Sequence, residues 1–177
     1  SSDALIRLDM SEFAGEHTVS KLYGSPPGYV GSTEPESWLT TRIRKRPQSL
    51  LLLDEIEKAH PLVWNAFLQV FDAGILTDTA GRVAHFSDVV VIMTTNIGAE
   101  AFADKNDIGF ADILVDPGAQ ESDVQADLKR SMRPELLNRL DGTVVFRPLT
   151  METVREIARN RIAEALVRLQ DRGWTVT

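Results

Sequence analysis

The stretch Leu50-Leu51-Leu52-Leu53-Asp54-Glu55 places two adjacent carboxylates directly after four apolar residues. A short apolar run between polar residues is typical of a parallel strand that is buried on both faces. Open α/β sheets bind ligands at the edge where such strands end. There, Asp54 can hold Mg²⁺ and Glu55 can polarise a water for attack on a phosphoryl group. The alternative, two solvated acids at a strand end, stays open on these residues alone.

A second apolar run, Val89 to Met93, ends in the polar residues Thr94-Thr95-Asn96. It predicts a second buried strand. If the two strands are neighbours, Asn96 and Glu55 face the same crevice, where Asn96 can orient the attacking water or sense a γ-phosphate. The alternative for a single asparagine is a turn residue that tolerates unusual backbone angles.

Strands and helices alternate along the rest of the chain. Leu5 to Leu8 and Val144 to Phe146 are two further candidate buried strands, and residues 75–84 predict a small hairpin around a polar turn. The predicted helices are 17–23, 36–45, 61–71, 124–130, one that opens at 134–139, and a long one that Thr150 caps. Residues 102–120 lack a clear period and are the expected mobile segment. This alternation favours an α/β fold with a mostly parallel sheet.

Composition excludes several classes of protein. The chain has 177 residues, of which 43% are apolar and 25% charged, which is ordinary for a globular domain. No apolar run approaches the ~20 residues of a membrane span, so we expect no membrane partner. The net charge of −7 disfavours nucleic acid as the main partner. The absence of cysteine excludes disulfides and fits a reducing compartment, so we expect a cytoplasmic location.

Arg139 lies in the segment Arg133 to Asp141, RPELLNRLD, near the end of a short predicted helix. An arginine in that place can reach the phosphate of a neighbouring subunit, and such a residue accelerates hydrolysis by roughly 10³ to 10⁵. The alternative is a surface arginine that pairs with Glu135 or Asp141.

Residues Gly24 to Gly31, GSPPGYVG, must form a loop because they contain two prolines and three glycines. Tyr29 and Val30 stand between glycines in this loop and offer apolar area with which to grip a polypeptide. The alternative is that Tyr29 packs back into the core of its own domain.

The chain carries no phosphate-binding loop of the form G-x-x-x-x-G-K-[ST], which a nucleoside triphosphatase of this layout needs. No lysine of the chain is followed by Ser or Thr. The lysines are Lys21, Lys45, Lys58, Lys105 and Lys129.

Six stretches, in this order, resemble the second ATPase module of Clp/ClpB-type AAA+ unfoldases. The resemblance runs from about Leu5 to Leu149. The stretches are RLDMSEF (7–13), GSPPGYVG (24–31), LLDEIEKAHP (52–61), LTDTAGRV (76–83), VIMTTNIG (91–98) and RPELLNRLD (133–141).

The resemblance implies a hydrolytic set. Asp54 and Glu55 match the Walker B acids, which serve Mg²⁺ and water activation, and both contribute to nucleotide binding together with Asn96. Asn96 matches the first sensor, and Arg139 matches the arginine finger that acts on the neighbouring subunit. The implied cofactors of the complete module are ATP and Mg²⁺.

The resemblance also implies a substrate path. Tyr29, with Val30, matches the aromatic pore loop that drags an unfolded chain through a hexameric ring, and Thr79 to His85 match the region of a second pore loop. The implied partners are unfolded or aggregated polypeptides, further copies of the protein in a homo-hexamer, and a protease or co-chaperone. Membranes and nucleic acids are not expected as partners.

The implied fold is an AAA+ P-loop NTPase-like three-layer sandwich with a parallel sheet, in which the central phosphate-loop strand is missing. Residues 1–148 would be the large subdomain without its Walker A loop, and 149–177 the start of a helical small subdomain. We therefore expect a fragment of a longer protein. A gap or a substitute strand is expected between the Val89 and Val144 strands.

The first functional hypothesis is an ATPase, part of an ATP-driven unfoldase or disaggregase, with the isolated chain inactive. The alternative is a nucleotide-free binding or docking module derived from this fold. Other AAA+ classes, such as transcriptional activators and clamp loaders, are disfavoured by the aromatic GYVG loop and the acidic net charge.

Overall fold

The structure is a computed structural model that describes residues 4–24, 37–98, 117–147 and 149–170. It divides into two compact units, Ser1–Gly142 and Thr143–Thr177, and each is described by itself. Among the described residues, no helix combines the length and apolarity that a membrane crossing requires.

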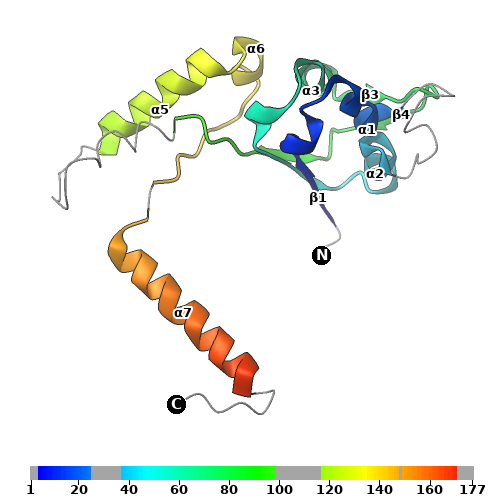
Figure 1. Ribbon diagram of the computed structural model, residues 1–177. Coiled ribbons are helices and arrows are strands. Elements are labelled where there is room, and N and C mark those ends of the chain that lie inside the picture. The colour runs from blue at the N-terminus through cyan, green and yellow to red at the C-terminus, as the bar shows by residue number, and fades with distance from the viewer. Residues whose placement is uncertain (1–3, 25–36, 99–116, 148, 171–177) are drawn as a thin grey trace. The chain divides into compact units, whose positions relative to one another are not determined.

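Three parallel strands form the main sheet of the first unit (Figure 1). Their order is β1 (Leu5–Asp9), β2 (Leu50–Asp54) and β5 (Val90–Met93), so that β2 lies in the middle. The register aligns Leu50 with both Leu5 and Val90. This arrangement confirms the α/β fold with a parallel sheet and makes β2, which ends in Asp54, a neighbour of β5, which Asn96 follows by three residues.

The two strands of the site differ in burial. Leu51 and Leu53 of β2 are fully buried, and the opposite face of β2 is half-buried. The prediction of a buried strand at 89–93 is wrong for Val90 and Ile92, which are 61% and 45% exposed. The cause is position, because β5 pairs with β2 alone among the described strands.

The predicted strand Val144 to Phe146 is wrong. These residues form no strand, and Val144 and Phe146 are 79% and 87% exposed. A strand requires a hydrogen-bonding partner, and none of the described strands pairs with this stretch. The sequence predicts a gap between the Val89 and Val144 strands. Of these two strands, the described structure contains only the first, as β5.

The helices follow the predicted pattern with shifted bounds. They are η2 (Met10–Phe13), η3 (Glu16–Val19), α1 (Ser20–Tyr23), α2 (Leu39–Lys45), η5 (Ile56–Lys58), α3 (Pro61–Ala73), α5 (Pro117–Ser131), α6 (Pro134–Leu137) and α7 (Met151–Gln170). The segment expected at 17–23 divides into η3 and α1. Residues 117–120, expected to be mobile, belong to α5.

Helix α3 has clear start and stop signals. The Nδ1 of His60 accepts a hydrogen bond from the backbone of Leu62 at 3.3 Å, and Pro61 occupies the first turn. Gly74 ends the helix in the left-handed conformation, with φ of 67°. The buried face contains Val63, Trp64, Ala66, Phe67 and Val70. The helix thereby contributes a large part of the core.

The predicted hairpin is confirmed. Strands β3 (Ile75–Thr77) and β4 (Val83–His85) pair antiparallel, with Leu76 opposite Ala84. Both of these side chains are buried and so anchor the hairpin in the core of the first unit.

Helix α7 of the second unit begins with the predicted cap. The Thr150 hydroxyl accepts a hydrogen bond from the backbone of Thr153 at 3.2 Å. Apolar residues recur along this helix at helical spacing but are exposed, with Ile162 at 59% and Val154 at 41%. The period of the sequence thus indicates the helix but not its burial.

Truncation of a core leucine tests this account of the core. Leu51→Ala should lower the free energy of unfolding by about 2–5 kcal/mol, because it leaves a cavity beneath the sheet. Leu62→Ala, on the exposed side of α3 where the side chain is 38% exposed, should cost less than about 1 kcal/mol. Urea unfolding measures both, and equal losses would contradict the assigned core.

Candidate active site

The ends of β2 and β5 bring Asp54, Glu55 and Asn96 together. The side-chain amide of Asn96 donates a hydrogen bond to Oε1 of Glu55 at 3.1 Å. The contact depends on the parallel pairing, since the backbone of Thr94 donates to the carbonyl of Leu53 at 2.9 Å and extends the ladder past β5. This contact confirms that Asn96 and Glu55 lie side by side, as the sequence predicts.

Thr94 connects the two acids, and the sequence reasoning assigned it no role. Its hydroxyl donates to Oδ1 of Asp54 and accepts a hydrogen bond from the backbone of Glu55 at 3.0 Å. Its carbonyl accepts a third bond, from the backbone of Ile56, at 3.0 Å. The sequence does contain a signal for this role. Thr94 is the first polar residue after the apolar run 89–93, just as Asp54 is the first after the apolar run 50–53.

The backbone of Glu55 is left-handed, with φ and ψ both at 55°. It is the only non-glycine residue with positive φ in the part of the chain that the structure describes. This conformation costs about 1–3 kcal/mol for a residue with a side chain, and such strain clusters at functional sites. The three bonds of Thr94 hold Glu55 in place at the point where the chain leaves β2.

Two cations contact the acids. Arg7 of β1 forms an ion pair with Asp54, and Lys58 Nζ lies 2.6 Å from Oε2 of Glu55. The hydrogen bond from Thr94, followed by that from Arg7, lowers the pKa of Asp54 below its ordinary value. The hydrogen bond to Glu55 raises the pKa of Lys58. Asp54 is therefore a carboxylate at neutral pH.

Glu57 contacts the backbone of Asn96. Its Oε1 accepts a hydrogen bond from the backbone of Asn96 at 3.1 Å, while its Oε2 is buried with no partner among the described residues. Glu57 also lines a pocket of about 330 Å³ together with Trp64, Ile97 and Arg133.

Arg139 lies elsewhere. Its Nη2 is 2.6 Å from Oδ1 of Asp72, and both side chains are about half exposed. Asp72 follows Pro61 by eleven positions on α3, about 17 Å along the helix. Glu135 and Asp141, the alternative partners expected from the sequence, do not pair with Arg139 in the described structure. Arg139 therefore lies apart from Asp54, Glu55 and Asn96 of the same chain. Tyr29 and Val30 lie outside the described residues.

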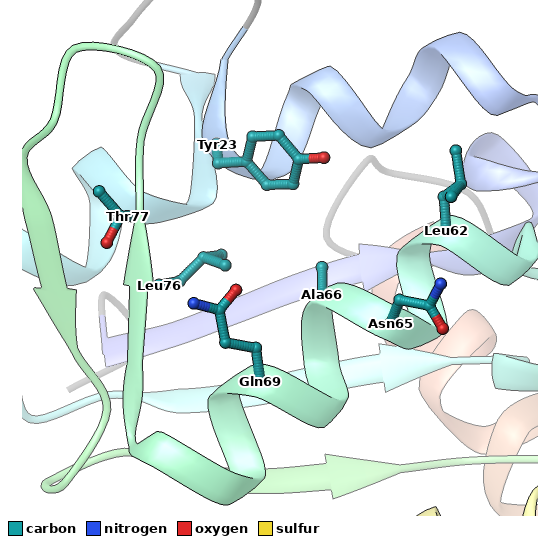
Figure 2. Close-up of a pocket in the computed structure, with 7 residues that line it drawn as sticks. All are labelled: Tyr23, Leu62, Asn65, Ala66, Gln69, Leu76 and Thr77. Carbon is teal, nitrogen blue, oxygen red and sulfur yellow. The ribbon is translucent and has the colours of Figure 1, made fainter.

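A second pocket, of about 360 Å³, opens between α3 and the hairpin (Figure 2). Its α3 side presents Leu62, Asn65, Ala66 and Gln69, and Tyr23 with Leu76 and Thr77 form the opposite side. None of the three acids or Asn96 lines this pocket. It is therefore a surface distinct from the end of the sheet.

The donor set at the sheet end fits a magnesium–phosphate site in part. The described residues contain no group of three or more acids or histidines that would hold a metal by themselves. Mg²⁺ does not require such a group, because it usually takes one or two carboxylates and completes its shell with phosphate oxygens and water. Asp54, ionised and 24% exposed, supplies the carboxylate. The phosphate-cradling loop is not among the 177 residues.

Comparison with known proteins defines the class of the fold. Residues 1–143 match the family model described as AAA domain (Cdc48 subfamily). The chain is 45% identical to the ATP-dependent Clp protease ATP-binding subunit ClpC of Staphylococcus epidermidis, and equally to that of Staphylococcus aureus. Each alignment covers 98% of this chain and 21% of the relative.

A solved structure agrees. A closed-state cryo-EM reconstruction of Hsp104 with ATPγS and FITC-casein superposes with a TM-score of 0.76 at 35% identity, over 95% of this chain and 28% of that one. The chain belongs to the AAA+ ATPases and is a Clp/ClpB-type module among them. It spans about a fifth of the length of its ClpC relatives.

Removal of the Thr94 hydroxyl tests the electrostatics of the site. Thr94→Val should raise the pKa of Asp54, because the lost hydrogen bond is the largest cause of the lowered value. Thr95→Val is the matched control, since the Thr95 hydroxyl accepts only from the backbone of Ile97 in the described structure. Carboxyl-detected NMR titration measures both, and an unchanged Asp54 pKa in Thr94→Val would contradict the assignment.

Proposed function

We propose that this chain supplies the hydrolytic centre of an ATP-driven Clp-family unfoldase or disaggregase that threads polypeptides through a hexameric ring. The observation that carries the proposal is the Asn96–Glu55 hydrogen bond at the ends of neighbouring strands. Family membership supports it, as do the names of the ClpC relatives, which are ATP-binding subunits of an ATP-dependent protease.

Each site residue has a distinct role in this proposal. Asp54 would hold Mg²⁺, and bound Mg²⁺ would neutralise charge on the phosphates. Glu55 polarises the attacking water, and Asn96 fixes the Glu55 carboxylate and orients that water. Lys58 must release Glu55 for this step, since it now occupies the second carboxylate oxygen.

Arg139 acts on the neighbouring subunit in this proposal. Its half-exposed guanidinium, held by an exposed aspartate and not by a buried one, is available to a second copy. Head-to-tail assembly that closes into a ring would place Arg139 of one copy at the nucleotide of the next. Tyr29 and Val30 would hold an unfolded or aggregated polypeptide, with a protease or co-chaperone as a further partner in the cytoplasm.

The base is tested in the full-length protein that contains this chain. Glu55→Gln should retain ATP binding and lose hydrolysis, because glutamine keeps the oxygen that accepts from Asn96 but cannot take up a proton. Glu12→Gln, whose carboxylate faces Lys21 at 3.4 Å, is the control and should hydrolyse normally. Turnover that survives in Glu55→Gln would show that another group is the base.

ATP binding, measured in the isolated 177-residue chain and in the full-length protein, separates the two functional hypotheses. We expect binding no tighter than millimolar, and no turnover, because the chain lacks the amides and lysine that cradle the phosphates. Titration calorimetry with Mg-ATP measures this. Micromolar binding would contradict the expectation. If the full-length protein also failed to bind ATP, the nucleotide-free docking module would be favoured.

A further inference from the structure

Asn96 is held at two atoms by the segment that follows β2. Its side-chain amide donates to Oε1 of Glu55, and its backbone N–H donates to Oε1 of Glu57, each at 3.1 Å. The first bond belongs to the proposed chemistry, in which Asn96 fixes the Glu55 carboxylate. The second bond is made by a carboxylate to which that chemistry assigns no role.

Glu57 lies in η5, the short turn between β2 and α3, and backbone bonds fix this turn against the chain that follows β5. The N–H of Ile56 donates to the Thr94 carbonyl at 3.0 Å, and the Ile56 side chain is buried. The N–H of Lys58 closes the turn on the Glu55 carbonyl at 3.0 Å. The turn therefore directs the Glu57 carboxylate to the chain two residues beyond Thr94.

Asn96 lies past the end of the β2–β5 ladder, where its side chain is exposed. In the part of the chain that the structure describes, neither its N–H nor its carbonyl bonds to another backbone group. The bond to Glu57 is thus the described contact that holds the main chain of Asn96, from which the amide reaches Glu55.

Asp78, in the turn of the β3–β4 hairpin, shows how this fold satisfies a buried carboxylate. Its Oδ1 accepts from the backbones of Ala80 and Arg82, and its Oδ2 from the side chains of Arg82 and Arg44. Glu57 differs, because its Oε2 is buried and has no hydrogen-bond partner among the described residues. A buried acceptor without a partner destabilises the folded state, so stability alone does not account for the carboxylate of Glu57.

We propose that Glu57 is a positioning residue for hydrolysis, which fixes the main chain of Asn96 so that the Asn96 amide stays on Glu55. This inference rests on the proposed function, in which Glu55 activates the attacking water. Glu57 transfers no proton in this role, because its Oε1 acts only as an acceptor. Without this bond, the main chain of Asn96 moves away from η5 and the Glu55 carboxylate loses the donor that orients it. The loss falls on the chemical step and not on ATP binding.

The kinetic test uses Glu57→Ala and Glu57→Gln in the full-length protein. Glu57→Ala should lower kcat for ATP hydrolysis about tenfold, as for the loss of one hydrogen bond to a charged group, with KM for ATP unchanged. Glu57→Gln keeps an oxygen that accepts from Asn96 and should restore most of the rate. Ser131→Ala is the control, because Ser131 lines the same pocket as Glu57 and makes no bond to Asn96. Parental kcat in Glu57→Ala, or no rescue in Glu57→Gln, overturns the proposal.

Hydrogen exchange gives a readout that does not depend on turnover. In the nucleotide-free full-length protein, Glu57→Ala should speed exchange of the Asn96 backbone N–H about tenfold. The N–H of Thr94, which donates to the Leu53 carbonyl, should exchange as in the parent. Mass spectrometry with fragmentation to single residues measures both. Unchanged exchange at Asn96 overturns the proposal, and so does faster exchange at both residues, which a general loosening of the sheet end would produce.

Two further variants keep the proposal testable. If Glu57→Ala does not fold, Glu57→Asp replaces it, because aspartate keeps the charge but is one methylene too short to reach Asn96, and should cause the same loss. Asn96→Ala keeps the backbone N–H and removes the amide. In that background Glu57→Ala should lower the rate no further, since the effect of Glu57 passes through the amide. A further tenfold fall overturns the proposal.

Glu55→Gln separates this inference from the proposed function. If Glu55→Gln still hydrolyses ATP, the assignment of the base is wrong, and the role of Glu57 falls with it. If Glu55→Gln stops hydrolysis while Glu57→Ala keeps the parental kcat, the proposed function stands and the positioning role alone is overturned.

Discussion

Everything at the candidate site depends on the parallel pairing of β2 with β5. The register places Leu53 beside Met93, so the residues that follow the two strands emerge side by side. Thr94 then continues the ladder by one hydrogen bond. Its hydroxyl donates to Asp54 and accepts from the backbone of Glu55. A shift of this register by one residue would separate Asn96 from Glu55 and place Thr94 on the wrong face of the sheet.

Two kinds of polar cluster occur in the same small fold. At the end of the sheet, partly exposed groups of opposite charge share hydrogen bonds and ion pairs that water and ligands can reach. At the hairpin, a buried carboxylate is fully satisfied and has no reason to rearrange. The first unit thus combines an exposed, adaptable polar centre at the sheet end with a buried, fully hydrogen-bonded carboxylate at the hairpin.

The sequence predicts the local structure of this chain well because local signals dominate it. The apolar run before Asp54, the proline and glycine that bound α3, and the cap at Thr150 act over a few residues. Burial was predicted less well, since it depends on neighbours. Val144 and Ile162 have the pattern of buried residues and are exposed, because apolarity indicates what a side chain favours and not what covers it. Arg139 likewise pairs with Asp72, which is distant in sequence and therefore is not indicated by local spacing.

The left-handed backbone of Glu55 has a consequence for how this position can vary. A glycine there would adopt the same conformation without steric cost and would stabilise the turn, but it would remove the carboxylate that Asn96 contacts. Stability and chemistry therefore favour different residues at one position. A chain selected only for stability would favour glycine at this position, whereas this chain carries the glutamate whose carboxylate Asn96 contacts.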